Sequence, residues 1–166
     1  MHIRLLNNDD TKIFCVLRSE AVYESPSSFA ESINEITEKP FTDFSYQLDS
    51  HGRGDFVLGA FDQANNLIGM VGFYRAVHAK KTHKGTLWGM YVIPECRQKG
   101  IGSALVSAAI ERAKNLPNIL HITLCVTATN DVAKRLYASM GFQIYGVEKN
   151  AIHIDGKFFD EVLMQL

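Results

Sequence analysis

The stretch that decides the fold is YVIPECRQKGIGSAL, residues 91–105. An apolar, strand-like run stops at Pro94, continues through Arg97 and Lys99, passes Gly100 and Gly102, and then becomes the first turn of a helix. A helix N-terminus leaves backbone N–H groups unpaired and carries a partial positive charge, so it attracts anions. Glycines at that point let a phosphate approach the backbone closely. The stretch therefore predicts a phosphate or pyrophosphate site between a strand and a helix, with Arg97 and Lys99 adding positive charge.

Two familiar phosphate-binding loops do not fit this stretch. A dinucleotide-binding fingerprint would have its third glycine at position 105, which is Leu105 here. A P-loop would end in Gly-Lys followed by Ser or Thr, and that ending is missing. The anion that binds at this loop therefore belongs to another class of ligand.

The flanking sequence predicts alternating helices and strands. Before the loop we expect a strand, two or three helices of which the second is more polar, a strand hairpin and a further strand; after it we expect a helix, a strand, a short helix and a final pair of strands. The short helix has Asn130 or Asp131 as its cap and Gly141 at its end. The expected strands cover residues 2–6, 55–61, 67–76, 86–93, 119–127 and the two sides of a turn at 154–157, and the expected helices cover 12–24, a polar segment closed by Pro40, 42–50, 101–116 and 130–141. This order predicts an α/β protein with a mixed sheet and helices on its faces.

Length and charge limit the classes of protein and partner. A chain of 166 residues, 46% of them hydrophobic, is long enough for one domain with a core, so we expect a single domain over residues 1–166. The net charge is -1, which gives no overall attraction to nucleic acid or to an anionic membrane. No apolar run approaches the ~20 residues of a membrane span. We therefore expect neither a nucleic-acid partner nor a membrane partner.

The cysteines and histidines give no sign of a disulfide or a metal site. Cys15, Cys96 and Cys125 are odd in number and lack metal-ligand spacing, so we expect free thiols, a reducing compartment and a cytoplasmic location. Cys125 lies in an apolar strand pattern and is expected in the core. Cys96 is expected at an ordinary solvent-facing loop position, with a reactive thiol as the alternative. His51, His78 and His83 are too scattered to predict a metal site.

Two segments together resemble a known family. Met90 to Glu95 followed by Arg97-Gln-Lys-Gly100-Ile-Gly102 resembles the acyl-CoA pyrophosphate loop of the GCN5-related N-acetyltransferases (GNAT). The segment TNDVAKRLYASMGF resembles that family's other recurring segment, and the closing DGKFFDEVLMQL resembles its last strands. In the second segment the matching residues are Asn130, Ala133, Leu136, Tyr137, Gly141 and Phe142. The resemblance is specific over residues 86–166 and only topological over residues 1–85.

The resemblance implies a fold and assigns the two ligands to different halves of the chain. The implied sheet is mixed and mostly antiparallel, with a central pair of parallel strands, 87–92 and 119–126, that splay apart, and with helices on both faces. Residues 1–85 would form the acceptor side and residues 86–166 the side that binds acetyl-CoA, the implied acyl donor.

The resemblance also implies the residues that hold the donor. The backbone of Met90, Tyr91 and Val92 would bond the pantetheine and thioester, and Asn130 would contact the cofactor arm. The amides that would hold the pyrophosphate, beside Arg97, belong to Gln98, Lys99, Gly100, Ile101, Gly102 and Ser103.

Acetyl transfer to an amine requires a neutral amine, stabilisation of the developing oxyanion and a proton for the departing thiolate. The resemblance places Tyr137 at the sulfur as the proton donor; packing of the ring on the sheet is the alternative role. The base is open: Glu20, Glu24 and His83 are candidates, each of which is also explained as an ordinary exposed charge or a capping group. No carboxylate lies in the strand TLWGMYV, residues 86–92.

The acceptor is the least determined part. A primary amine of a small molecule, or the N-terminus or a lysine of a protein, fits the implied chemistry, and residues 18–45, 75–85 and 145–158 would select it. A non-catalytic CoA-binding sensor or partner subunit is the alternative function. A homodimer through an exposed sheet edge is a further expectation.

Overall fold

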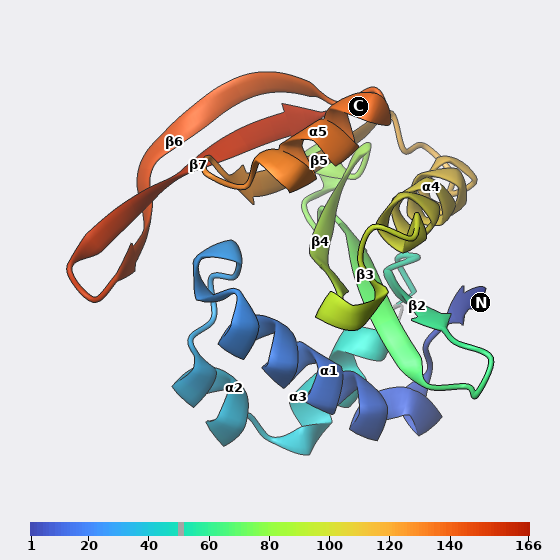
Figure 1. Cartoon of the computed structure of the whole chain (residues 1–166). Helices are drawn as coiled ribbons and strands as arrows, with labels where there is room; N and C mark the ends of the chain where they lie inside the picture. The colour runs from blue at the N-terminus through green and yellow to red at the C-terminus, as the bar shows by residue number, and fades with distance from the viewer. Residues whose placement is uncertain (50–51) are drawn as a thin grey trace.

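The computed structural model describes residues 1–49 and 52–166, so Ser50, the last residue of one expected helix, and His51 lie outside the described residues. Among the described residues, seven strands form one sheet in the order β1-β2-β3-β4-β5-β7-β6 (Figure 1). All neighbouring pairs are antiparallel except β4 and β5. The strands are β1 (His2–Leu5), β2 (Phe56–Phe61), β3 (Leu67–Arg75), β4 (Lys84–Val92), β5 (His121–Thr127), β6 (Gln143–Ile154) and β7 (Lys157–Gln165).

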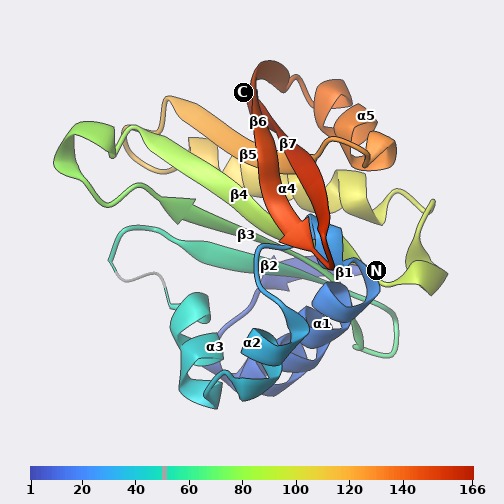
Figure 2. The same ribbon diagram turned by 90° about the vertical axis from the view of Figure 1, so that its left-hand side faces the viewer.

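The helices lie on both faces of this sheet. Figure 2 shows α1, α2 and α3 on one face and α4 and α5 on the other. The α-helices are α1 (Thr11–Glu24), α2 (Ile33–Glu38), α3 (Phe41–Leu48), α4 (Ile101–Lys114) and α5 (Asp131–Ser139), and short 3-10 turns are η1 (Asn8–Asp10), η2 (Pro26–Ser28), η3 (Ala79–Lys81) and η4 (Pro94–Cys96). The predicted mixed sheet with one parallel pair is confirmed. The expected strand over 119–127 begins two residues later, at His121, because Ile119 and Leu120 lie in the connection from α4.

Two hydrophobic cores hold the layers together. Strand β2 is buried along its whole length, and its successive side chains point to opposite faces of the sheet and pack in both cores. Phe56, Leu58 and Ala60 join the core under α4, whereas Val57 and Phe61 join the core under α1 to α3. A strand that is buried on both faces has a continuous apolar sequence, as residues 56–61 do.

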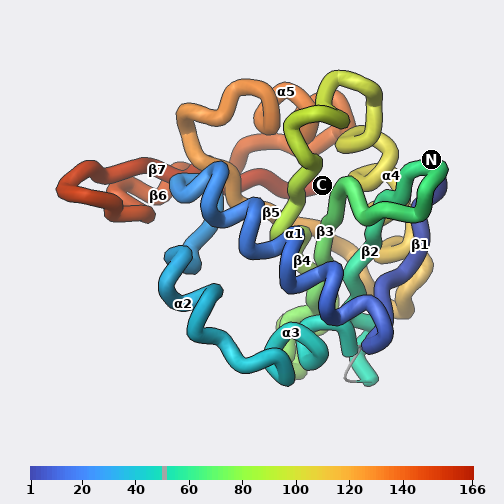
Figure 3. The backbone as a smooth tube through the Cα atoms, turned by 60° about the horizontal axis from the view of Figure 1, so that its bottom comes forward, coloured from blue at the N-terminus to red at the C-terminus, as the bar shows by residue number. Residues whose placement is uncertain are grey.

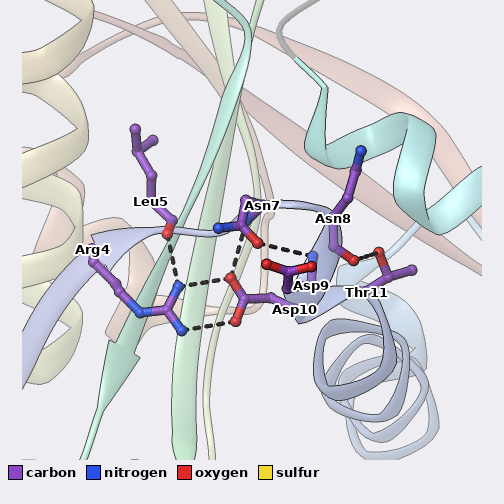
Figure 4. A network of polar contacts seen from close by, with 7 residues as sticks. All are labelled: Arg4, Leu5, Asn7, Asn8, Asp9, Asp10 and Thr11. Atoms are coloured by element: carbon purple, nitrogen blue, oxygen red, sulfur yellow. Dashed lines mark hydrogen bonds and ion pairs between the residues drawn. The ribbon is translucent and has the colours of Figure 1, made fainter.

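A polar network fixes the junction between β1 and α1 (Figure 4). The guanidinium of Arg4 donates to both carboxylate oxygens of Asp10, at 2.6 and 2.7 Å. Asp10 also accepts from the backbone N–H of Asn7 at 3.0 Å, and the side chain of Asn7 accepts from the N–H of Asp9. The Arg4 guanidinium therefore holds the pKa of the buried Asp10 carboxyl below its usual range, against the effect of burial.

The C-terminal hairpin is the longest extension of the sheet. Strands β6 and β7 reach well beyond the other strands, past the end of α1, as the tube in Figure 3 shows. Gly156, with φ +78°, lies in the turn that joins them. No helix in the described part of the chain has both the length and the apolar character needed to cross a membrane.

Candidate active site

Strands β4 and β5 separate halfway along their length. Their parallel pairing runs only from Lys84 with His121 to Thr86 with Thr123, where the two threonine hydroxyls lie 3.0 Å apart. From Leu87 onward no residue of β4 pairs with β5. The edge of β4 that faces β5 therefore has backbone groups available for a ligand.

A bulge turns β4 at this point. Gly72 of β3 pairs with Trp88 and Met70 pairs with Tyr91, so the single residue Val71 lies opposite both Gly89 and Met90. Gly89 has φ +60°, a left-handed conformation that favours glycine. Trp88 and Tyr91, three residues apart, consequently pack on the same side of the sheet.

The gap between the strands opens into a cleft of about 780 Å³, within the range of small-molecule sites. Residues of β4, β5, the start of α4 and helix α5 line it. Tyr137 and every residue predicted to bind the donor line this cleft except Lys99, whose ammonium group folds back onto the carbonyl of Glu95 at 2.8 Å. The three candidate bases do not line it.

The loop before α4 presents backbone rather than side chains. Gln98 and Gly100 both have positive φ, 59° and 78°, and a Cβ on Gly100 would meet no atom within 4 Å. Gly100 is the N-cap of α4 and makes no side-chain cap, so the first-turn N–H groups of this 14-residue helix are open to an anion. A Cβ on Gly102 would lie 2.7 Å from the terminal methyl of Met90. These features fit the phosphates and arm of a CoA ester.

Arg97 has a different partner from the one expected. Its Nη1 and Nη2 donate to the two carboxylate oxygens of Glu24 at 2.9 and 2.5 Å, and its Nε donates to the carbonyl of Val92 at 2.9 Å. This pairing ties the loop to the end of α1 and holds the pKa of Glu24 below its usual range. The charge of Arg97 is therefore already balanced, and the carbonyl of Val92 is already occupied.

Tyr137 lies near the end of α5 with its ring buried against Phe142, at a centroid distance of 5.9 Å. It lines the cleft, and burial raises the pKa of its phenol to about 12. A phenol with this pKa stays protonated throughout the neutral range, so its O–H remains able to donate a hydrogen bond. Both roles expected from the sequence, packing and donation, are available to the same side chain.

The candidate bases are placed less favourably. Glu24 is neutralised by Arg97, and Glu20 is exposed on α1 with one carboxylate oxygen 3.5 Å from the hydroxyl of Tyr91. His83 lies at the opposite end of β4, where its carbonyl accepts from Leu120 and His121. Among the described residues that line the cleft, none is Asp, Glu or His.

Asn130 caps α5. Its side-chain oxygen accepts from the N–H of Ala133 at 3.1 Å, which decides between the two expected caps. Because Asn130 also lines the cleft, its amide nitrogen is the part left for a ligand.

The prediction that Cys125 lies in the core is wrong. Leu124 and Val126 point into the core under α4 and α5, so strand alternation turns Cys125 to the other face, which is uncovered beside the splay. There it lines the cleft, and partial burial and the carboxylates of Glu161 and Glu148 raise the pKa of its thiol. Cys96 is half-buried in η4 rather than freely exposed.

The end of the cleft near α1 and η2 is built with residues that sequence reasoning did not single out. Arg18 of α1 is buried against Phe29 and Trp88 and forms an ion pair with Glu31 at 2.6 Å. The hydroxyl of Thr127 donates to the carbonyl of Ser27 at 2.5 Å and joins β5 to η2. These contacts join residues from 13 to 100 positions apart, so spacing within a single motif gives no signal for them.

Comparison with known proteins decides the family. The sequence profile of the Acetyltransferase (GNAT) family matches residues 19–142, well over half of the chain. The chain belongs to this family. As one of its members it uses acetyl-CoA as acyl donor, and the open helix terminus and the unpaired edge of β4 fit that molecule.

Solved structures similar to this GNAT chain support the fold over its whole length. A GNAT-family acetyltransferase from Streptococcus pneumoniae has a TM-score of 0.85 and 23% identity, covering 99% of this chain and 98% of that one. A ribosomal-protein-alanine N-acetyltransferase from Brucella melitensis has a TM-score of 0.86 and 22% identity, covering 100% and 99%. A phosphinothricin acetyltransferase from Sinorhizobium meliloti, in complex with AcCoA, has a TM-score of 0.86 and 20% identity, covering 99% and 86%.

Proposed function

We propose that this protein transfers the acetyl group of acetyl-CoA to a primary amine by direct attack while donor and acceptor are bound together. The observation that carries the proposal is one cleft that joins the unpaired edge of β4, the open N-terminus of α4 and the buried phenol of Tyr137. An anion site, a strand edge and a hydrogen-bond donor for the thiolate in one cleft match the three parts of an acyl-CoA reaction.

The backbone holds the donor in this scheme. The amides of Gln98 to Ser103 bind the pyrophosphate, and the backbone of Met90, which has no strand partner in β3 or β5, binds the pantetheine. Tyr91 contributes less than the sequence implied, because it pairs with Met70 of β3. Val92 contributes less than the sequence implied, because Arg97 occupies its carbonyl. An N–H of the β4 bulge stabilises the oxyanion that forms as the amine nitrogen attacks the acetyl carbonyl.

Tyr137 assists the leaving thiolate when the carbon–sulfur bond breaks. A phenol with a pKa of about 12 is a weaker acid than a thiol with a pKa of about 8.5, so complete proton transfer is uphill by roughly 5 kcal/mol. Tyr137 therefore donates a hydrogen bond to the developing thiolate, and the thiolate takes its proton from the amine or from solvent as the reaction completes.

The amine that loses its proton is an α-amine in this proposal. A lysine amine is neutral at pH 7 at a cost of roughly 4 to 5 kcal/mol, whereas an α-amine with a pKa near 7.8 costs about 1. The described residues that line the cleft include no Asp, Glu or His to act as a base. The acceptor amine therefore has to be largely unprotonated when it binds. The three free cysteines support a reducing compartment, and we place the protein in the cytoplasm.

The test combines binding with turnover. Acetyl-CoA should raise the melting temperature, and thiol release should depend on an added amine from a panel of amino acids, polyamines and peptides with free N-termini, with the acetylated product identified by its mass. A thermal shift without release from any amine would contradict catalysis and favour a CoA-binding sensor. The lack of a shift would contradict the donor site itself.

A further inference from the structure

Arg18 is a buried cation at the acceptor end of the cleft. Its residue exposure is 6%, and its guanidinium packs on Phe29 and Trp88, at 4.7 and 5.5 Å from the ring centroids. Burial lowers the pKa of this guanidinium and Glu31 opposes that effect, but an arginine stays charged in proteins. A full positive charge therefore lies behind the aromatic side chains that line this part of the cleft.

The polar partners of Arg18 account for only part of its donors. Nη2 donates to Glu31 at 2.6 Å, while Nε and Nη1 are buried and have no hydrogen-bond partner among residues 1–49 and 52–166. The other carboxylate oxygen of Glu31 is engaged by Lys39, so two cations share one carboxylate. Buried donors without partners are costly, and proteins rarely keep them without a ligand or a role.

The free side of the guanidinium faces the bulge of β4. A Cβ built on Gly89 would lie 3.4 Å from Nη1, which places this nitrogen directly beside the backbone of Gly89. Gly89, Trp88 and Phe29 all line the cleft. Arg18 itself does not line the cleft and its Nη1 is covered, so a small anion at the bulge, where the reacting carbonyl is proposed to lie, would reach Nη1 beside Gly89 once the rings of Phe29 and Trp88 that pack on the guanidinium move aside.

We propose that Arg18 binds the carboxylate of the acceptor, so that the acceptor is a small amino acid whose carboxylate lies next to the amine that is acetylated. This inference rests on the proposed acetyl transfer. The short separation follows from the geometry, since the anion would bind at the same bulge as the acetyl group. A polyamine would bring a second cation to an unbalanced positive charge, and a protein N-terminus has an amide where the carboxylate is required.

The same contact assists the chemistry. A carboxylate next to an amine stabilises the ammonium form, and pairing that carboxylate with Arg18 removes this effect. The positive charge of Arg18 itself favours the neutral amine. Arg18 thus acts as a specificity residue that also lowers the cost of deprotonation, in a cleft whose described lining has no carboxylate or imidazole base.

The experiment compares three acid and amide pairs: alanine with alaninamide, methionine with methioninamide, and phenylalanine with phenylalaninamide. The amine of the amide is less basic than the amine of the acid, so more of it is neutral at a given pH. Amine basicity alone would therefore make the amide the better substrate. We expect at least one acid to exceed its amide by about 10- to 100-fold in kcat/KM, the range of a charge-assisted hydrogen bond. Equal use, preference for the amide in every pair, or no acetylation of any acid would overturn the proposal.

Two variants locate the effect. Arg18→Gln should reduce the ratio of acid to amide to about one or below, and Arg53→Gln, which removes an arginine that is paired with Asp55 away from the cleft, should keep the wild-type ratio. A folded Arg18→Gln protein with the wild-type ratio would overturn the proposal. If Arg18→Gln fails to fold, the wild-type ratio still decides. If the protein binds acetyl-CoA and acetylates the amides but not the acids, this inference alone is refuted. If it does not bind acetyl-CoA, the proposed function is refuted.

Discussion

The two sides of the cleft would recognise their ligands by different means in the proposed reaction. On the proposed donor side, around β4 and the start of α4, recognition would rest on backbone geometry: a splayed edge, a bulge and the glycine N-cap of a helix. On the proposed acceptor side, around α1 and η2, it would rest on side chains such as Arg18, Glu31 and Phe29. Recognition by the backbone requires particular residues, such as glycine, at neighbouring positions, so it leaves a motif in the sequence. Recognition by side chains brings together residues that are far apart in the sequence, so it leaves no such motif.

The largest effect should come from the donor-side backbone. Gly100→Glu would place a carboxylate in the open space before α4, so we expect at least about 1,000-fold weaker acetyl-CoA binding by calorimetry. Gly156→Glu is the matched control, because Gly156 has the same φ of +78° and the same empty surroundings in the turn of the β6–β7 hairpin. Equal affinities for the two variants would remove the α4 terminus from the donor site.

The second effect separates chemistry from donor binding. Tyr137→Phe should lower kcat by about 100-fold while changing the acetyl-CoA affinity by less than about threefold, because the ring keeps its packing on Phe142. Since burial raises the pKa of this phenol to about 12, its ionisation should cause no loss of wild-type activity up to about pH 10. Tyr74→Phe, on an exposed ring, is the control. Unchanged kcat in Tyr137→Phe would leave Tyr137 a packing role only.

The third effect tests how side chains hold the N-terminal helices in place. Asp10→Asn should lower the free energy of unfolding by about 1 to 2 kcal/mol at pH 7, because it breaks the paired contact with Arg4 and weakens the acceptor for the N–H of Asn7. Because the folded state lowers the pKa of Asp10, this stability is present above the unfolded pKa of about 3.9 and is lost as the pH falls through the lower folded value.

Denaturant unfolding at several pH values measures this difference. The wild type and Asp10→Asn should differ at pH 7, and the difference should shrink as the pH falls below the unfolded pKa of about 3.9 toward the lower folded value. A difference that stays constant across this range would contradict the assigned ion pair. Asp9→Asn, which changes an exposed neighbour in the same turn, is the control.

The smallest effect concerns Glu24. If Glu24 serves only as the partner of Arg97, Glu24→Gln should lower kcat by less than about threefold, measured by thiol release. A general base would lower kcat by about 100-fold or more on the same change. A loss of kcat of that size that is recovered at high pH would show that Glu24 acts as the general base.

The same contrast explains which features could be predicted from the sequence. The strands around the hairpins, the helix after Gly100 and a cap at Asn130 or Asp131 follow from periodicity and turn residues; the structure confirms them and makes Asn130 the cap. The burial of Cys125 was mispredicted because an apolar strand pattern does not say which face has a helix above it, and β5 is uncovered on the side of the splay. The pairing of Glu24 with Arg97 joins residues 73 positions apart, which local patterning does not detect.

The most direct test of the donor site is amide hydrogen exchange of the full chain with and without acetyl-CoA, followed by mass spectrometry of peptides across residues 86–116. We expect new protection in two segments, Gly89 to Val92 and Gln98 to Ser103, because the ligand would take up the unpaired N–H groups of the β4 edge and the α4 terminus. Protection confined to other segments, or none at saturating acetyl-CoA, would contradict recognition of the donor by the backbone of this cleft.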